Sequence, residues 1–348
     1  MRILYLSFSN TDRSVNKVYI KGLEQNGVEV LSHWSNREGV KKFFDIAKFY
    51  RLNHKNVDFL IVGYDSPGLV VWLAMISRKK IIYNALCSVY ERLVVSRGLA
   101  SKFSLKAFYY WLLDFLACHT ASLTMLESNQ QIDYFSKLFF VPKKKCFLAR
   151  TGVDEEYFYF EPNIKKFDEF TVIFRGRLLP EAGAEYVVMA AKKLENQGVK
   201  FIMHSFGQEL QKIQDLIAQL KPVNLKLETK ILPDEQLREL MQKSHLSLGQ
   251  LSAHDRLTRT IPHKAYESLT LKLPYLTARN KGIMELLKEN ETCLAFKPAD
   301  ADDLAAKILW AKNYPQELAI IAENGRRLYL EHLTSKLLAE KILERIAK

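Results

Sequence analysis

The chain has 348 residues, of which 48% are hydrophobic and 26% charged, a balance typical of a folded protein long enough for two domains. Its low content of Gly and Pro, 14 and 10 residues, excludes a fibrous or low-complexity chain. Almost the whole net charge of +12 lies in residues 1–150, where 22 Lys and Arg stand against 11 Asp and Glu, and this points to an anionic partner for the first half.

The four cysteines are scattered, with neither metal-ligand nor disulfide spacing. We therefore expect buried thiols in a reducing compartment. The chain opens directly on an apolar strand at residues 2–8, so we expect no signal peptide. No uncharged apolar run reaches the length of about 18 residues that a transmembrane helix needs. These features predict a cytoplasmic protein.

Apolar runs alternate with amphipathic segments through the first half of the chain. Strands are predicted at residues 2–8, 28–31, 58–62, 80–83, 122–127 and 145–148. Helices are predicted at residues 15–26, 40–53, 69–77 and 101–121. This alternation predicts a parallel sheet with helices on both faces. We assign residues 1–150 to an N-terminal Rossmann-like domain.

The predicted helix at residues 101–121 is unusually aromatic and apolar around Trp111. Four basic residues lie at or just before its start: Arg92, Arg97, Lys102 and Lys106. Such a composition is typical of a helix that lies in a membrane interface, and the alternative is a core helix of the first domain. A second basic cluster follows at Lys137 and residues 143–145. We therefore predict that residues 92–116 and 137–150 can dock on an anionic membrane surface, which would make the protein peripheral on the inner face of the membrane.

The alternation begins again after residue 150. Strands are predicted at residues 170–174, 200–204, 225–228, 246–248, 274–277 and 293–296. Helices are predicted at residues 181–197, 209–220, 233–244, 264–270, 283–288, 301–313, 316–329 and 335–347. We assign residues 151–330 to a second Rossmann-like domain and residues 331–348 to a C-terminal helix.

Two segments of the second half carry the most chemistry. Residues 170–183, FTVIFRGRLLPEAG, predict a strand, a glycine turn with Arg177 and a helix start, an arrangement that places a cation and free backbone N–H groups where phosphates bind. Residues 261–277, IPHKAYESLTLKLPYLT, place Lys264 and Glu267 on a helix before a buried strand. A carboxylate can accept both hydroxyl groups of a ribose. The two segments together predict a site for a nucleoside diphosphate.

Both segments resemble the nucleotide-sugar glycosyltransferases of the GT-B fold, specifically the large retaining family 4. The resemblance implies two Rossmann-like domains that face each other across a cleft, with the final helix returning to the first domain. It also implies an enzyme that moves a hexose or related sugar from a nucleotide-diphosphate donor, held by residues 151–330, to a glycan or lipid-linked acceptor, held by residues 1–150. Anomeric configuration would be retained, as in polysaccharide or glycoconjugate biosynthesis, and neither a metal nor another cofactor is expected.

The resemblance also implies roles for single residues. Donor diphosphate contacts are expected at Arg177, Lys264, Gly282 and Ile283, and a donor ribose contact at Glu267. Further contacts with donor or acceptor are expected at Ser9, Asn10, Asn84, Gly207, Arg259 and His263. The resemblance identifies no catalytic base.

Two positions depart from the family pattern. Ala182 stands where the family usually has a lysine that touches the diphosphate, and Arg259 stands where it usually has a carboxylate. These departures leave open an alternative, a nucleotide-sugar-binding or partner subunit that has lost transfer activity. A nucleic-acid partner is not expected, because the chain contains no recognised nucleic-acid-binding motif.

Overall fold

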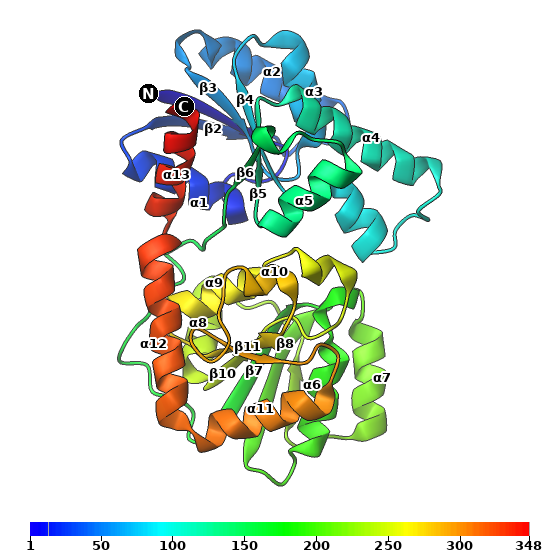
Figure 1. Ribbon diagram of the computed structural model, residues 1–348, viewed down its shortest axis with the longest axis vertical. Helices are drawn as coiled ribbons and strands as arrows, with labels where there is room; N and C mark the ends of the chain where they lie inside the picture. Colours follow the sequence, from blue (N-terminus) through cyan, green and yellow to red (C-terminus); the bar gives the residue numbers. More distant parts are fainter. Residues whose placement is uncertain (13, 348) are drawn as a thin grey trace. The chain divides into compact units, whose positions relative to one another are not determined.

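The computed structural model describes residues 1–12 and 14–347, and the chain divides into two compact units. Unit 1 comprises Met1–Asp154 together with Leu333–Lys348, and unit 2 comprises Glu155–His332. Each unit has its own six-stranded sheet and its own hydrophobic core (Figure 1). The boundaries therefore fall at residues 154/155 and 332/333.

The sheet of unit 1 is parallel throughout, in the order β2-β1-β3-β4-β5-β6. Its strands are β1 (Arg2–Ser7), β2 (Glu29–Trp34), β3 (Phe59–Val62), β4 (Ile81–Leu86), β5 (Leu123–Leu126) and β6 (Cys146–Leu148). The chain passes from β1 to β2 on one side and then to β3 on the other. The carboxyl ends of β1 and β3 therefore border a topological switch point, where open α/β sheets bind their ligands.

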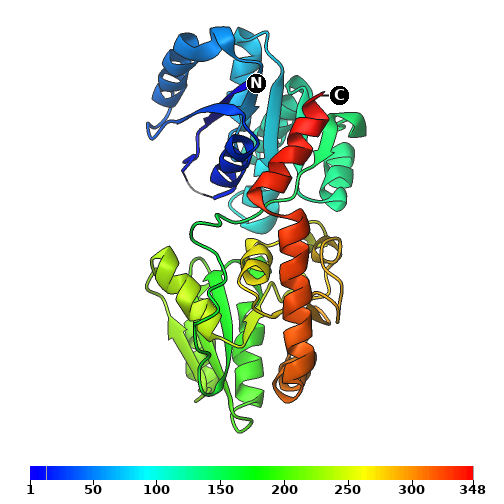
Figure 2. The same cartoon turned by 90° about the vertical axis from the view of Figure 1, so that its left-hand side faces the viewer.

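Helices cover both faces of this sheet. They are α1 (Ser14–Gln25), α2 (Lys41–Asn53), α3 (Pro67–Ile76), α4 (Leu105–Thr120), α5 (Asn129–Leu138) and α13 (Ser335–Ala347). The C-terminal helix α13 packs on α1 (Figures 1 and 2). The approach is so close that a Cβ atom on Gly22 would lie 2.0 Å from the Ser335 carbonyl oxygen. A residue with a side chain at position 22 would push the two helices apart.

Unit 1 differs from the sequence-based prediction in three places. Helix α5 was not predicted; it begins at a Ser128 cap, whose hydroxyl accepts a hydrogen bond from the Gln131 N–H at 2.8 Å. A π-helical turn at Glu91–Ser96 precedes α4. Helix α4 itself begins at Leu105 rather than at residue 101, because the Ser104 hydroxyl caps its first turn. Within the described ranges, no helix is long and apolar enough to cross a bilayer.

The sheet of unit 2 is also parallel, in the order β12-β11-β10-β7-β8-β9. Its strands are β7 (Phe170–Arg177), β8 (Val199–Phe206), β9 (Leu225–Glu228), β10 (Leu246–Leu248), β11 (Tyr275–Ala278) and β12 (Leu294–Phe296). Its helices are α6 (Ala184–Lys193), α7 (Leu210–Leu220), α8 (Asp234–Lys243), α9 (His263–Thr270), α10 (Lys281–Met284), α11 (Ala301–Asn313) and α12 (Pro315–His332). The strand order reverses between β7 and β10, so this pair borders the switch point of unit 2.

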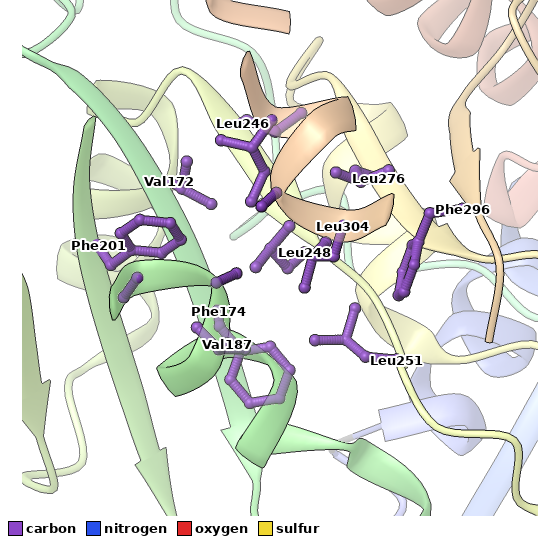
Figure 3. Close-up of a cluster of buried hydrophobic side chains, with 14 of the residues drawn as sticks. Val172, Phe174, Val187, Phe201, Leu246, Leu248, Leu251, Leu276, Phe296 and Leu304 are labelled. Carbon is purple, nitrogen blue, oxygen red and sulfur yellow. The ribbon is translucent and has the colours of Figure 1, made fainter. Parts of the chain in front are cut away.

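The core of unit 2 fixes the position of that switch point. Phe174 of β7 and Leu248 of β10 are fully buried and lie in one apolar cluster with residues of α6 and α11, among them Leu304 (Figure 3). Burying each large side chain contributes about 1.5–3 kcal/mol. The cluster therefore holds the ends of β7 and β10 rigidly beneath the loops that follow them.

One buried carboxyl group gives unit 1 a pH-dependent stability. Asp114 of α4 is 1% exposed, and its Oδ2 accepts the Tyr90 N–H at 2.8 Å. Burial raises the pKa of Asp114 from 3.8 to about 7. Between these values the unfolded chain has lost the proton while the folded chain keeps it, so the free energy of unfolding falls as pH rises.

We predict that Asp114→Asn stabilises the protein at pH 8 and that this advantage disappears near pH 4. The asparagine oxygen can still accept the Tyr90 N–H, but the side chain cannot ionise. The full difference is on the order of 4 kcal/mol. Urea unfolding at the two pH values measures it, with Asp168→Asn, whose side chain is 89% exposed, as the control. An equal effect of Asp114→Asn at both pH values would show that this carboxyl does not titrate as described.

Candidate functional site

The candidate site lies at the carboxyl ends of β7 and β10. Strand β7 runs three residues further than predicted, so Arg177 is its last residue rather than part of the following turn. Gly176 has a φ of +115°, a conformation that side chains disfavour. A Cβ atom there would lie 3.3 Å from Cε of Lys264. The glycine thus opens the strand end and lets Lys264 approach it.

Arg177 is exposed at this strand end. Within the described residues, its guanidinium makes no hydrogen bond and no ion pair. The turn after β8 supports the backbone beside it, because Leu178 N–H donates to the Phe206 carbonyl at 2.7 Å. Gly207, with a φ of +132°, lets this turn pack on Leu178, where a Cβ atom would lie 3.1 Å from the backbone. Gly207 therefore positions the Arg177 segment through backbone packing.

Lys264, the second residue of α9, is buried at the switch point, with 7% of its surface exposed. Its Nζ lies 3.4 Å from the Gly249 carbonyl oxygen and 3.5 Å from Oε1 of Gln250, both long for hydrogen bonds. It also lies 3.8 Å from the centroid of the Phe174 ring. No carboxylate in the described part of the chain pairs with it.

The surroundings of Lys264 disfavour its charged form. Burial holds its pKa well below the ordinary value, and the positive charge of Arg175 acts in the same direction, against a smaller opposing effect of Glu181. An anion bound at this position would raise the pKa of Lys264, because an opposite charge stabilises the ammonium group. The switch point of unit 2 is thus arranged to gain stability from a bound anion.

Glu267 lies one turn after Lys264 on α9, and its carboxylate forms an ion pair with Arg175 of β7. The side chains are 10% and 16% exposed. The sequence analysis did not identify Arg175 as a site residue. An arginine at the end of an apolar strand run could have indicated this pair, because arginine is rarely buried unless it is paired.

His263 begins α9 beside this ion pair. Burial lowers its pKa to about 4, and the charge of Arg175 contributes to the shift. Its Nε2 is buried and has no hydrogen-bond partner among the residues described. His263 is therefore neutral at physiological pH and adds no positive charge to the site.

The two departures from the family pattern have structural explanations. Ala182 is fully buried and belongs to the apolar core of unit 2. The adjacent Glu181 is 2% exposed and forms an ion pair with Arg256 at 2.6 Å. Arg259 is 6% exposed and pairs with Asp255 at 2.8 Å. The charged side chains beside Ala182 and around Arg259 therefore form ion pairs with one another.

The short helix α10 closes the other side of the site. Gly282 packs against the backbone of Arg259 and Thr260, where a Cβ atom would meet three atoms at 2.7 Å. Ile283 is 2% exposed. The N–H groups at the start of a helix have no partners within the helix, so those of residues 281–283 can donate to a ligand. Gly282 and Ile283 therefore have only backbone groups to offer a ligand.

Three of the predicted contact residues lie in unit 1 rather than unit 2. Ser9 N–H donates to Oγ of Ser7 at 3.0 Å, and Oδ1 of Asn10 accepts the Asp12 N–H at 2.7 Å. Asn84 of β4 is 1% exposed, and its Nδ2 has no partner within the described residues. Ser9 and Asn10 follow β1 at the switch point of unit 1, whereas Asn84 lies within the neighbouring part of the sheet.

A metal site is not formed by the described residues: no three His, Cys, Asp or Glu side chains among them are placed to hold an ion. Two cavities of the described chain lie away from the switch points. One is lined by residues such as Lys200 and Asn224 at the amino ends of β8 and β9, and the other by Lys80 and Arg345 in unit 1.

Comparisons with known proteins agree with this geometry. The family model described as "Glycosyl transferases group 1" matches residues 157–328, nearly the whole of unit 2. The amylovoran biosynthesis glycosyltransferase AmsK of Erwinia amylovora is 25% identical over 218 residues, which cover 59% of this chain and 52% of that protein. The matched region thus spans about half the length of this curated relative.

Solved structures share the fold over the whole chain. HepE of Anabaena, in complex with UDP and glucose, has a TM-score of 0.75 at 18% identity, with 100% of this chain and 99% of that chain covered. Sucrose-phosphate synthase of Thermosynechococcus elongatus has a TM-score of 0.78 at 15% identity, with 99% and 98% covered. The predicted fold of two Rossmann-like α/β units is confirmed. The family model thus matches unit 2, just under half of the chain, and the solved structures share the fold of the whole chain.

Proposed function

We propose that this chain, whose unit 2 matches the group 1 glycosyl transferases, moves a sugar from a nucleotide-diphosphate donor to a glycan or lipid-linked acceptor with retention of configuration. Unit 2 takes the donor and unit 1 takes the acceptor. The observation that carries the proposal is the buried Lys264 beside the exposed Arg177 at the switch point of unit 2. Two cations at this point are suited to the diphosphate of a nucleotide sugar.

The basic side chains and N–H groups of the site favour a diphosphate as the ligand. Arg177 offers a planar guanidinium that can contact two phosphate oxygens at once. Lys264 is held among neutral oxygens and an aromatic face, so a phosphate would be its first anionic partner in the site. The first N–H groups of α10, at Gly282 and Ile283, add donors from a third direction. The carboxylate of Glu267 accepts hydrogen bonds and would repel a phosphate, so it is suited to the two hydroxyl groups of a ribose.

The same groups account for the chemistry. When the bond between the anomeric carbon and the phosphate oxygen breaks, negative charge grows on the departing diphosphate. Arg177, Lys264 and the α10 backbone would stabilise that charge more in the transition state than in the bound donor. The acceptor hydroxyl then bonds to the anomeric carbon on the face that the diphosphate leaves, and its proton passes to an oxygen of the departing diphosphate. In this scheme the positive charge comes from the protein, and no metal is required.

The comparisons suggest the first substrates to test. HepE was solved with UDP and glucose, and AmsK is described as an enzyme of amylovoran biosynthesis. We therefore propose UDP-sugars as the first donors and a polysaccharide or glycoconjugate intermediate as the acceptor. The second candidate, a nucleotide-sugar-binding subunit without turnover, is favoured by Ala182 and by the tethered Arg259. Turnover with any member of a panel of UDP-, GDP-, ADP- and CMP-sugars decides between them.

The start of α4 supports a membrane-bound acceptor. We define the α4 tip as residues 99–109, where large apolar side chains face solvent: Leu99, Phe103, Leu105, Phe108 and Tyr109. Phe103 is 100% exposed and Leu105 89% exposed. Lys102 and Lys106 are exposed among them. Apolar side chains interleaved with lysines are suited to insertion into an anionic lipid surface.

The second predicted membrane segment, residues 137–150, does not extend this surface. Lys145 adjoins the last turn of α4, at the opposite end from the tip, where its Nζ donates to the His119 carbonyl at 2.6 Å. Lys143 is paired with Asp133 at 2.5 Å. We therefore place the docking surface on the α4 tip alone, a narrower region than the sequence analysis predicted.

We predict that Arg177→Ala lowers the affinity for the best-bound nucleoside diphosphate by about 10- to 150-fold, because a charged hydrogen-bond partner is lost. Calorimetric titration measures the affinity, and the melting temperature without ligand confirms folding. Arg327→Ala removes an exposed arginine on α12 and should change nothing. Equal affinity of wild type and Arg177→Ala would mean that the diphosphate binds elsewhere.

We also predict that the protein sediments with liposomes containing an anionic lipid and that salt weakens this binding. Lys106→Gln should lower the partition coefficient about fivefold, since each basic residue near such a surface contributes about 1 kcal/mol. Phe103→Ser should lower it further by removing an inserted ring. Lys144→Gln is the matched control, because it removes one exposed positive charge at the far end of α4. Equal losses for Lys106→Gln and Lys144→Gln would contradict docking through the α4 tip.

A further inference from the structure

The ion pair between Arg175 and Glu267 joins two elements of the candidate site. Arg175 lies on β7, two residues before Arg177, and Glu267 lies on α9, one turn after Lys264. Nη2 of Arg175 contacts Oε2 of Glu267, and both side chains are largely buried. Oε1 of Glu267 makes no hydrogen bond within the described part of the chain, so it can accept one from a ligand.

The pair also affects Lys264. Residues three apart on a helix lie side by side, so an unrestrained Glu267 could form an ion pair with Lys264. In the structure the Lys264 Nζ turns instead to the Gly249 carbonyl and to Gln250. Arg175 therefore occupies the carboxylate that would otherwise neutralise the lysine.

Arg175 can perform this function at physiological pH. Burial lowers the pKa of its guanidinium to about 10, and the negative charge of Asp234 and the side chain of Tyr275 oppose the shift. The guanidinium thus stays charged. His263, whose pKa the charge of Arg175 helps to lower, is neutral. The ion pair of Arg175 with Glu267 is therefore kept at physiological pH.

We propose that Arg175 is a positioning residue of the donor site: it fixes Glu267 through Oε2, presents Oε1 to the ribose hydroxyls, and keeps Lys264 available to the diphosphate. This inference rests on the proposed function, since it assumes that a nucleoside diphosphate binds at this edge. It adds a residue with a defined role in sugar recognition. An arginine that only stabilised the fold would have no influence on which pentose is bound.

The test compares each of UDP, GDP and ADP with its 2′-deoxy counterpart by calorimetric titration. The wild type should bind the best ribonucleotide about tenfold or more tightly than its 2′-deoxy form, because a hydrogen bond to a charged group is lost. Arg175→Met should bring this ratio close to one and should also weaken binding of inorganic pyrophosphate, because Lys264 can then pair with Glu267. Arg175→Lys, which keeps the charge, should restore part of the ratio.

Arg177→Ala is the matched control, since it removes a neighbouring cation: it should weaken both forms of the nucleotide and leave their ratio unchanged. If Arg175→Met does not fold, Arg175→Lys carries the test, and an unchanged ratio there overturns the inference. A full wild-type ratio in a folded but less stable Arg175→Met shows a purely structural role and also overturns it. A wild type that binds nucleotides without discriminating the 2′-hydroxyl overturns this inference and leaves the proposed function standing. A wild type that binds none of the six overturns the proposed function itself.

Discussion

A buried lysine without a carboxylate partner is the constraint that organises unit 2. Burying a charge is unfavourable unless it is paired, and Lys264 has only long contacts to neutral oxygens and the face of Phe174. Two features of the fold keep Lys264 at this position and without a carboxylate partner. Gly176 has no side chain that would block its approach to the end of β7, and Arg175 holds the nearest carboxylate of α9. A bound anion would relieve this unfavourable environment, and on this ground we propose that the site takes a diphosphate.

The position of the cations distinguishes this chain from the family pattern that its sequence resembles. That pattern places a lysine at position 182, but Ala182 here is buried, and its neighbour Glu181 is paired with Arg256. The lysine of this site lies instead at the start of α9, at position 264. In unit 1, the exposed aromatic and basic residues of the α4 tip suit an acceptor that is presented at a membrane surface. We therefore propose that donor and acceptor are recognised by separate units with different surface chemistry.

The sequence was sufficient to predict the fold, because twelve strands alternate with helices and most strands contain an apolar run. It also identified Arg177, Lys264 and Glu267 as candidates, because they stand at strand and helix ends in a recognisable order. Two features escaped it for different reasons. Helix α5 had a visible signal, Ser128 followed three residues later by Gln131, which is the pattern of a capping box. The pairing of Arg175 with Glu267 had none, because it depends on how closely α9 approaches β7 in the folded chain. The separation of the two basic segments to opposite ends of α4 likewise follows from tertiary packing, not from spacing along the chain.

The position of a bound nucleoside diphosphate in a crystal of this protein is the measurement that tests these ideas most directly. Crystals soaked with the tightest-binding of UDP, GDP and ADP would provide it. We predict diphosphate oxygens within hydrogen-bonding distance of the Arg177 guanidinium and of Nζ of Lys264, with the ribose hydroxyls at Oε1 of Glu267. A nucleotide bound in unit 1, or at the same edge of unit 2 with neither cation in contact, would contradict the assignment of the donor site.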